Sequence, residues 1–216
     1  MKKIVCISDM HGTLPKIEKC DILIIAGDIC PADDHSILRQ LKFINGPFKD
    51  WLDEVPAINI VATFGNHDFI GEQNLISPLL RDDLRWTLLI DKAAEIQGLK
   101  FWGSPWQLWF YDWAFNAPKY QSEEFLEKKY SLIPDDTDVI ISHRPPKEYG
   151  DQTMQNDNVG SVSLLKRIDA IAPKLVVCGH IHFARGEYYH GKTKIINASI
   201  LDEAYKFAHQ PITVEL

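Results

Sequence analysis

Short apolar runs that are rich in β-branched residues recur along the chain and predict strands. Near-continuous runs of this kind are typical of strands that are covered on both faces. Two later runs, at residues 193–197 and 212–215, alternate more between apolar and polar positions, and they favour a second, antiparallel sheet. The five near-continuous runs fall at residues 4–8, 22–26, 58–64, 139–142 and 175–178.

Apolar residues at helical spacing lie between these runs and predict three helices. The first spans residues 37–55 and should break or kink at Pro47, which lacks a backbone donor. The second spans residues 122–132, with Ser122 as its N-cap and two glutamates in its first turn. The third follows a stripe at residues 164–172 and should end at the proline after it. Strands interleaved with helices predict an α/β fold.

Length and composition fit one globular domain covering residues 1–216. The chain has 216 residues, of which 45% are hydrophobic and 25% are charged, and we see no internal repeat or linker-like stretch. No apolar run approaches the roughly 18 residues that a membrane-spanning helix needs, so we expect no membrane partner. The apolar run near Met1 is too short for the core of a signal peptide.

The net charge and the cysteine content limit which binding partners and which cellular compartment fit this chain. The net charge of −7 argues against the binding of long nucleic acid, which requires basic patches. Small phosphorylated ligands remain compatible, because bound metal ions can supply positive charge. The four cysteines lack zinc-finger spacing, and Cys6 and Cys178 lie in apolar runs, where a free thiol behaves as a small hydrophobic group. We therefore expect a reducing compartment, the cytoplasm.

Each of the five buried runs is followed by polar residues of the kinds that bind metals. Ligand sites in open α/β sheets lie beyond the carboxyl ends of the strands, so we expect these residues to converge. Glycine precedes the ligand in three motifs, where it allows close approach of the backbone. Residues i and i+2 of an extended chain face the same side, so paired donors can share an ion. The motifs are Asp9-x-His11, Gly27-Asp28, Gly65-Asn66-His67-Asp68, His143 and Gly179-His180-x-His182.

The motifs together offer seven donors, which is too many for one tetrahedral ion. Taken singly, most of them have an ordinary structural explanation such as a turn, but the ordered set after five strands does not. Two ions that share a carboxylate and lie about 3.5–4 Å apart can clamp a phosphorus centre. Aspartate, asparagine and histidine without thiolate suit manganese first, with iron or zinc as alternatives. The seven donors are Asp9, His11, Asp28, Asn66, His143, His180 and His182. The histidines outside the five motifs, His35, His190 and His209, are interpreted as surface residues.

These five motifs, in this order, resemble the blocks of the calcineurin-like metallophosphoesterase superfamily. Shorter matches resemble its MPPED-type branch: Gly103-Ser104-Pro105-Trp106, Trp113-Ala114-Phe115-Asn116, His143-Arg144-Pro145-Pro146, Pro173-Lys174 and Ile196-Asn197-Ala198-Ser199. The resemblance implies a four-layer αββα sandwich of two mixed β-sheets flanked by helices. It also implies one ion on Asp9, His11 and His182, a second on Asn66, His143 and His180, Asp28 as a bridge, and His67 beside the leaving-group oxygen. Ile29-Cys30 after Gly27-Asp28 lacks the acidic and arginine motif of protein phosphatases, which argues against that class.

The resemblance implies a hydrolase that acts on phosphate esters. The preferred interpretation is a phosphodiesterase for small phosphodiesters such as cyclic nucleotides, with in-line attack by a metal-bridging hydroxide and proton donation by His67. A phosphomonoesterase, or a nuclease acting on short nucleic-acid ends, shares the same metal core and stays open. A non-catalytic scaffold on the same fold is the alternative from another class.

Three further features have two interpretations each. Arg144 can contact a phosphate, although a solvated loop arginine is the favoured interpretation. Asp68 can orient the His67 ring, or it can belong to a helix start or a turn. The aromatic segment at residues 101–115 can form a wall that stacks a nucleobase, or it can pack on the second sheet, which we favour because tryptophan dominates cores by area.

Overall fold

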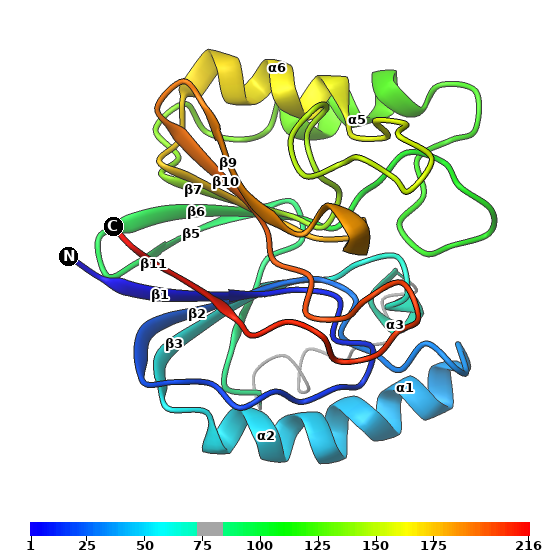
Figure 1. The fold of residues 1–216 in the computed structure, drawn as a ribbon, viewed down its shortest axis with the longest axis vertical. Helices are drawn as coiled ribbons and strands as arrows, with labels where there is room; N and C mark the ends of the chain where they lie inside the picture. The colour runs from blue at the N-terminus through cyan, green and yellow to red at the C-terminus, as the bar shows by residue number, and fades with distance from the viewer. Residues whose placement is uncertain (73–83) are drawn as a thin grey trace.

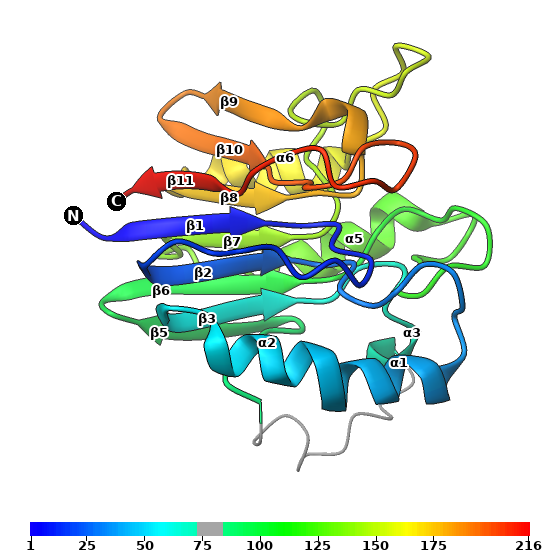
Figure 2. The same cartoon turned by 60° about the horizontal axis from the view of Figure 1, so that its bottom comes forward.

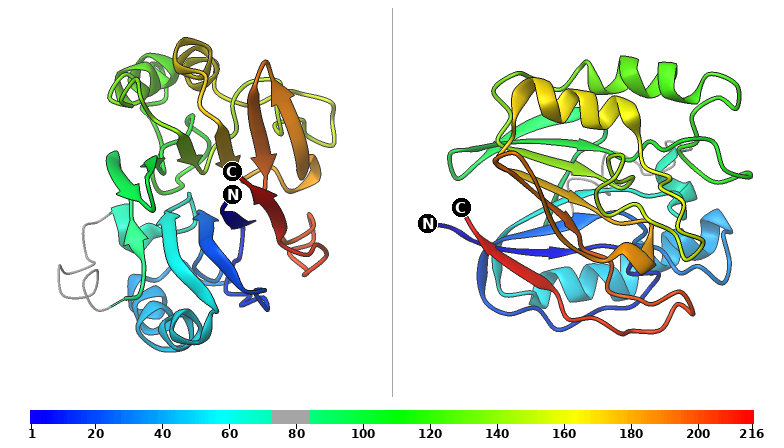
Figure 3. Two further views of the ribbon diagram at one scale, coloured as in Figure 1. Left: turned by 90° about the vertical axis from the view of Figure 1, so that its left-hand side faces the viewer. Right: turned by 45° about the horizontal axis from the view of Figure 1, so that its top comes forward.

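Two β-sheets lie face to face at the centre of the molecule, and helices cover the outer face of each (Figures 1 and 3). The computed structural model describes residues 1–72 and 84–216. Helices α1 (Ile37–Phe43) and α2 (Lys49–Glu54) cover one sheet, and α5 (Ser122–Tyr130) and α6 (Val162–Ile171) cover the other. The predicted α/β sandwich of two mixed sheets flanked by helices is confirmed.

Both sheets combine a parallel centre with an antiparallel edge strand. In the first sheet, β11 pairs antiparallel with β1, while β1 to β4 run parallel. In the second, β6, β7, β8 and β10 run parallel, and β5 and β9 are the antiparallel edges. The first sheet runs β11 (Ile212–Glu215), β1 (Lys3–Ile7), β2 (Cys20–Ala26), β3 (Ala57–Thr63) and β4 (Thr87–Leu88). The second runs β5 (Lys92–Ile96), β6 (Leu99–Ser104), β7 (Val139–Ser142), β8 (Leu175–Cys178), β10 (Thr193–Asn197) and β9 (Gly186–His190).

The prediction that residues 193–197 and 212–215 form a separate antiparallel sheet is wrong. Strand β10 extends the sheet of β8 in parallel, and β11 closes the edge of the sheet that contains β1. Strand β11 alternates buried and exposed side chains. Such alternation arises at a sheet edge with one face toward solvent, so it does not require a separate sheet.

The near-continuous apolar runs follow from burial on both faces. In β1, Val5 and Ile7 belong to the core beneath α1 and α2, whereas Ile4 and Cys6 belong to the core between the two sheets. A third core under α5 and α6 holds the outer side chains of the second sheet, among them Val176. Successive side chains of a strand point to opposite faces, so the middle of these strands is apolar at successive positions.

The predicted break at Pro47 takes the form of a π-helical turn. The turn spans Ile44–Phe48 and joins α1 to α2 without a loop. One extra residue in this turn accommodates the proline, whose missing N–H cannot support the regular ladder. The prediction for Ser122 is wrong: Gln121 is the N-cap of α5, and the Ser122 hydroxyl donates to the carbonyl of Pro118 at 2.8 Å.

The carboxyl ends of β1, β2 and β3 and those of β7 and β8 open toward the same side of the molecule (Figure 2). The loops that follow these strands therefore meet, together with the short α3 (Phe69–Glu72) and the 3-10 turn His182–Ala184. In the described parts of the chain, no helix is both long enough and apolar enough to cross a membrane.

Candidate metal centre

The structure brings the seven predicted donors together at this common end of the strands. Asn66 and His180 are 114 positions apart, yet the Asn66 Oδ1 lies 2.8 Å from the Nδ1 of His180. The same oxygen lies 3.0 Å from the Nε2 of His143. Three loops from both sheets thus converge on the Asn66 amide oxygen.

Asp28 stands between two groups of donors. Its Oδ2 lies 3.6 Å from the Nε2 of His11 on one side and 3.3 Å from the Nε2 of His143 on the other. Its Oδ1 accepts a hydrogen bond from the backbone N–H of His67 at 2.8 Å. One carboxylate oxygen therefore faces both halves of the site, which is the position that a bridging ligand needs.

Asp9 and His182 complete the half of the site that contains His11. The Asp9 Oδ1 lies 3.4 Å from the Nε2 of His182. The Asp9 carboxylate also accepts hydrogen bonds from the backbone N–H of His180 at 2.9 Å and from the hydroxyl of Ser199 at 2.5 Å. These bonds fix the carboxylate in a fully buried position.

Backbone carbonyls orient two of the histidine rings. The Nδ1 of His143 lies 2.9 Å from the carbonyl of Ala26, and the Nδ1 of His182 lies 2.8 Å from the carbonyl of Asp202. A carbonyl only accepts, so each ring carries a proton on Nδ1 and turns Nε2 toward the carboxylates. Metal-ligating histidines are commonly held in this way by a second contact.

Local backbone strain accompanies this convergence. Asp9, His11, Asp28 and His180 all have positive φ, between 42° and 70°. This region is disfavoured for residues other than glycine, and it costs on the order of 1–3 kcal/mol per residue. Four strained donors in one site indicate that the surrounding structure holds the backbone in this conformation, which places the donor side chains at the site.

The glycines of the motifs allow the close packing around the two aspartates. A Cβ at Gly65 would lie 2.3 Å from the Asp28 Oδ1, and a Cβ at Gly179 would lie 2.2 Å from the Asp9 Oδ2. Both distances are well below van der Waals contact, so only glycine fits beside these carboxylates.

The donors fit divalent ions. Neither ring nitrogen of the buried His11 has a hydrogen-bond partner among the described residues, which is unusual for a buried polar group. Two ligand atoms that each lie about 2.1 Å from one ion, and subtend an angle of roughly 90–110° at it, are about 3.0–3.4 Å apart. The distances from the carboxylate oxygens of Asp9 and Asp28 to the histidine Nε2 atoms are close to this separation. Asp9 with His11 and His182, and Asp9 with Asp28 and His143, form groups whose ligand atoms all lie within 4.8 Å of one another.

The charges of the site depend on burial and on the paired carboxylates. Burial lowers the pKa of His143, but the attraction of Asp28 outweighs it and raises this pKa to about 9. Burial likewise lowers the pKa of His182, but Asp9 raises it to about 9. For His11 burial prevails and lowers the pKa to about 4. Metal binding requires neutral imidazole, so ions that enter would displace protons from His143 and His182.

His67 lies at the edge of these donors. One of its ring nitrogens belongs to a group with His11 and Asp28 whose ligand atoms lie within 4.8 Å of one another. Its ring packs against that of Trp113 at a centroid distance of 4.2 Å, and its Nδ1 lies 3.2 Å from the Nε2 of His35. The interpretation of His35 as a surface residue is wrong, because the turn before α1 carries its half-buried ring to His67.

Asp68 does not contact the His67 ring in the described structure. Its carboxylate accepts hydrogen bonds from the backbone N–H groups of Ile29, Cys30 and Gly65, at 2.8 to 3.2 Å. Asp68 therefore ties the loop after β2 to the loop after β3, directly before α3, and of its two interpretations the helix-start or turn role is confirmed.

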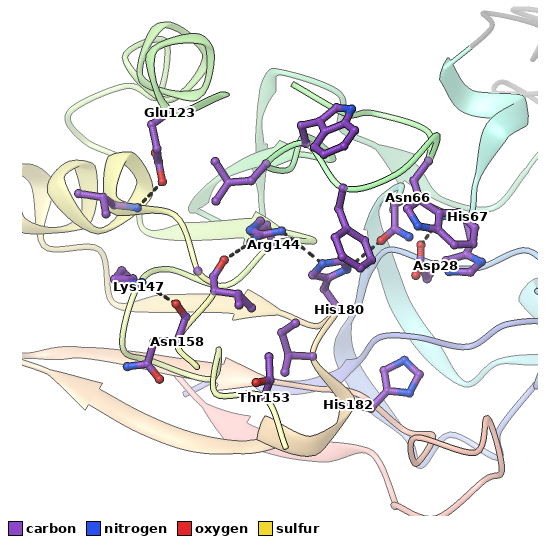
Figure 4. A pocket seen from close by; sticks show the side chains of 18 of the residues that line it. Asp28, Asn66, His67, Glu123, Arg144, Lys147, Thr153, Asn158, His180 and His182 are labelled. Carbon is purple, nitrogen blue, oxygen red and sulfur yellow. Dashed lines mark hydrogen bonds between the residues drawn. The ribbon is translucent and has the colours of Figure 1, made fainter. Parts of the chain in front are cut away.

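A pocket of about 580 Å³ opens from the metal centre and includes Asp28, Asn66, His67, His180 and His182 in its lining (Figure 4). Its volume is within the range of about 300–1,000 Å³ that is typical of small-molecule sites. Figure 4 shows Arg144 beside His180, with Lys147 and Asn158 farther from the metal-binding side chains.

The interpretation of Arg144 as a solvated loop residue is wrong, since it is only 5% exposed. Its Nη1 lies 3.4 Å from the Nε2 of His180, and its Nη2 donates to the carbonyl of Val159. Its Nε has no partner among the residues described. The loop after β7 folds back over the strand end, so the guanidinium lies against the metal centre.

The aromatic segment divides between the core and the pocket. Trp102 is buried in the core under α5 and α6, and Trp106 packs beside it, in agreement with the favoured interpretation. Trp109, Phe110 and Trp113 instead line the pocket, so that interpretation is wrong for them. A strand places Trp102 in the core, but the loop that follows leaves the sheet and passes along the pocket.

Several residues that support the donors carry no functional signal in the sequence pattern. The Ser199 hydroxyl donates to Asp9, the Asn197 Oδ1 accepts from the backbone N–H of Ser199, and the Asp202 carbonyl accepts from His182. The sequence Asn197-Ala198-Ser199 is part of the resemblance to the MPPED-type branch. That resemblance is the one signal that could have pointed to the side chains of Asn197 and Ser199. The Asp202 carbonyl carries no side-chain signal at all.

Comparison with known proteins identifies the family. Residues 2–184 match the family Calcineurin-like phosphoesterase. Metallophosphoesterase domain-containing protein 1 of Homo sapiens is 30% identical over 240 residues, which cover 99% of this chain and 71% of that relative. TT1561 of Thermus thermophilus has a similar solved structure, with a TM-score of 0.58 at 15% identity over 99% of this chain and 98% of its own. Phosphopantetheinyl Hydrolase from Mycobacterium tuberculosis also has a TM-score of 0.58, at 12% identity over 94% of this chain and 90% of its own.

The chain belongs to the calcineurin-like phosphoesterase family, whose members are metal-dependent phosphoester hydrolases. Within that family it is similar over its whole length to the MPPED-type relatives. The predicted family is thereby confirmed.

Proposed function

We propose that this protein is a phosphodiesterase that uses two divalent metal ions to hydrolyse small phosphodiesters, cyclic nucleotides among them. The observation that carries the proposal is the position of the Asp28 Oδ2, between the Nε2 atoms of His11 and His143. An oxygen that faces two separate sets of donors suits a pair of ions better than a single one. Asp9, His11 and His182 would hold one ion, and Asn66, His143 and His180 the other.

Two divalent ions, when bound, would supply Lewis acidity and activate water at neutral pH, with manganese as the first candidate and iron or zinc as alternatives. The rest of the chemistry belongs to the chain. Arg144 would donate to a non-bridging oxygen of the phosphoryl group, because it lines the pocket and its Nη1 lies 3.4 Å from the Nε2 of His180. His67 would give a proton to the departing oxygen, a step worth about 10²- to 10⁴-fold in rate.

The shape of the cavity supports a diester with a group on each side of the phosphorus. The 580 Å³ pocket extends from the metal centre past Arg144 to Lys147 and Asn158. A second hollow of about 420 Å³ shares His11, His67, Trp113 and Tyr205 with this pocket and is also lined by Ala32 and Asp33. A diester has one group for each of these spaces, whereas a monoester has a group for only one.

Charge and thiol content support a small substrate and a reducing compartment. The net charge of −7 leaves no excess of positive charge for long nucleic acid, so a small phosphodiester or nucleotide is the proposed partner. All four cysteines are buried as free thiols, which suits the cytoplasm. A phosphomonoesterase, or a nuclease on short ends, would use the same donors.

The test compares hydrolysis of bis-p-nitrophenyl phosphate and p-nitrophenyl phosphate with Mn²⁺ added, for wild type and for Asp28→Ala. Turnover of the diester that disappears in Asp28→Ala supports the proposal. Turnover mainly of the monoester would replace it with the phosphomonoesterase. No turnover and no bound metal would favour the non-catalytic scaffold.

A further inference from the structure

The imidazole ring of His67 is held by two side chains that no sequence motif connects with it. On one side its Nδ1 lies 3.2 Å from the Nε2 of His35. The ring of Trp113 packs on it at a centroid distance of 4.2 Å and contacts the His35 ring at 5.1 Å. His35, His67 and Trp113 thus form one aromatic cluster beside the metal centre.

The backbone of His67 is fixed independently of this cluster. Its N–H donates to the Oδ1 of Asp28 at 2.8 Å, and its carbonyl accepts from the Nε2 of the buried Gln40 at 2.6 Å. The Gln40 Oε1 accepts from the N–H of Ile70, so α1 and α3 are tied together around His67. With the backbone held, the remaining freedom is rotation of the side chain, and His35 and Trp113 restrict that rotation.

The contact between the two histidines also determines which nitrogen of His67 can transfer a proton. A histidine that donates through Nε2 to a leaving group must keep a proton on Nδ1 to end as a neutral ring. That Nδ1 proton needs an acceptor, and the Nε2 of His35 is within hydrogen-bond distance of it. Catalytic histidines in other enzymes likewise depend on a partner that fixes the tautomer.

We propose that His35 is a positioning residue for His67: its Nε2 accepts the Nδ1 proton of His67, which leaves the Nε2 of His67 to protonate the leaving group. As the oxygen of the attacking water forms its bond to phosphorus, the bond from phosphorus to the ester oxygen breaks, and its electron pair stays with that oxygen, which takes the Nε2 proton. His67 ends neutral, with its remaining proton shared with His35, and regains the lost proton from water. This inference rests on the proposed function.

The surroundings of His35 support a positioning role. Its ring is half-buried and lies tilted against the Phe69 ring, at a centroid distance of 5.1 Å. The turn that carries it is held by Asp34, which accepts from the N–H of Ser36 at 2.8 Å, while Ser36 caps α1. The hollow of about 420 Å³ beside Ala32 and Asp33 opens next to this turn, where a leaving group can lie against His67.

Two variants separate hydrogen bonding from packing. His35→Phe keeps an aromatic ring against Trp113 and Phe69 but removes the acceptor. His35→Gln keeps an acceptor at a similar reach but cannot ionise. Ser36→Ala disturbs the same turn without touching either ring, so it serves as the matched control.

The first measurement is the ring-nitrogen NMR spectrum of the full chain without added metal. We expect wild type, His35→Gln and Ser36→Ala to show His67 protonated on Nδ1, and His35→Phe to show a mixture of tautomers. The second is kcat and KM with Mn²⁺ for phosphodiesters that carry either p-nitrophenol or phenol as leaving group. His35→Phe should lower kcat for the phenol ester by about 10- to 100-fold, with KM unchanged and the p-nitrophenyl ester slowed less than about 3-fold.

An unchanged His67 spectrum in His35→Phe would overturn the proposal, as would equal slowing of both esters or an equal defect in Ser36→Ala. Failure of His35→Gln to restore the phenol ester would also overturn it. If wild type hydrolyses neither ester, the proposed function fails, and with it the role of His35 in catalysis. The NMR result then still shows whether His35 sets the tautomer of His67, so the two failures are distinguishable.

Discussion

Substitution of Gly179 by alanine tests whether the metal centre depends on the close packing of its glycines. The backbone there does not have the positive φ that would exclude a larger residue, so only the added methyl group matters. Its carbon would lie 1.9 Å from the Ser8 Oγ and 2.2 Å from the Asp9 Oδ2. A carbon and an oxygen normally come no closer than about 3.2 Å, so the Asp9 carboxylate must move by about 1 Å.

The size of the effect follows from what Asp9 would lose. Its carboxylate accepts hydrogen bonds from the His180 N–H and the Ser199 hydroxyl. Each bond to a charged group contributes about 1.5–3 kcal/mol, so losing both lowers the free energy of unfolding by about 3–6 kcal/mol. For a chain of this size that is a fall in Tm of about 6 °C or more. A displacement of about 1 Å at a ligand also costs roughly 100-fold in kcat.

The assay measures Tm, metal content and kcat for Gly179→Ala beside wild type and Gly46→Ala. Gly46 has no atom within 4 Å of its would-be Cβ in the described structure, and it lies in the π-helical turn. Alanine there should be neutral or stabilising by up to about 1 kcal/mol. Metal binding and turnover at the wild-type level in Gly179→Ala would refute this reasoning.

Three further predictions concern the charges and contacts of the site. Without metal, Tm should fall as the pH rises from about 6.5 to 9, because the pKa values of His143 and His182 are raised to about 9 by Asp28 and Asp9 against the opposing effect of burial. The stabilisation is complete below the pKa that histidine has in the unfolded chain, and it is lost as His143 and His182 deprotonate in the folded protein. A flat or rising Tm over this pH range in differential scanning fluorimetry would contradict this prediction. Ser199→Ala removes a donor to Asp9 and should weaken metal binding about 10- to 100-fold in a calorimetric titration, whereas unchanged affinity would show that this contact is dispensable. Removal of metal by a chelator should abolish activity while far-UV circular dichroism persists, since three apolar cores hold the fold; loss of the helical signal would show that metal is needed for folding.

The sequence predicts the convergence of the seven proposed donors because each follows a strand that is easy to recognise. Asp28 and His143 come at the ends of apolar runs, and the carboxyl ends of such strands are where α/β proteins place ligands. That rule needs no knowledge of which strands pair. It therefore locates His143 in the site even though β7 lies in a different sheet from β2.

The same rule cannot locate residues that reach the site from loops or helix starts. His35 lies in a polar stretch with no pattern of its own, and its contact with His67 depends on how α1 packs on α3. Arg144 follows a strand end, but only the return of the chain at Val159 shows that it is buried. Tertiary pairing likewise decides to which sheet β11 belongs. The alternation of buried and exposed residues in β11 shows only that one face of the strand is exposed.

The most direct test of the two-ion site is the number of metal ions that each chain holds. Full-length wild type and Asp28→Asn would be loaded with Mn²⁺ or Zn²⁺, dialysed, and measured by inductively coupled plasma mass spectrometry against protein concentration. We predict two ions per chain in wild type and at most one in Asp28→Asn, because the Asp28 Oδ2 faces both donor sets. One ion or none in wild type, or two in Asp28→Asn, would contradict the two-ion site.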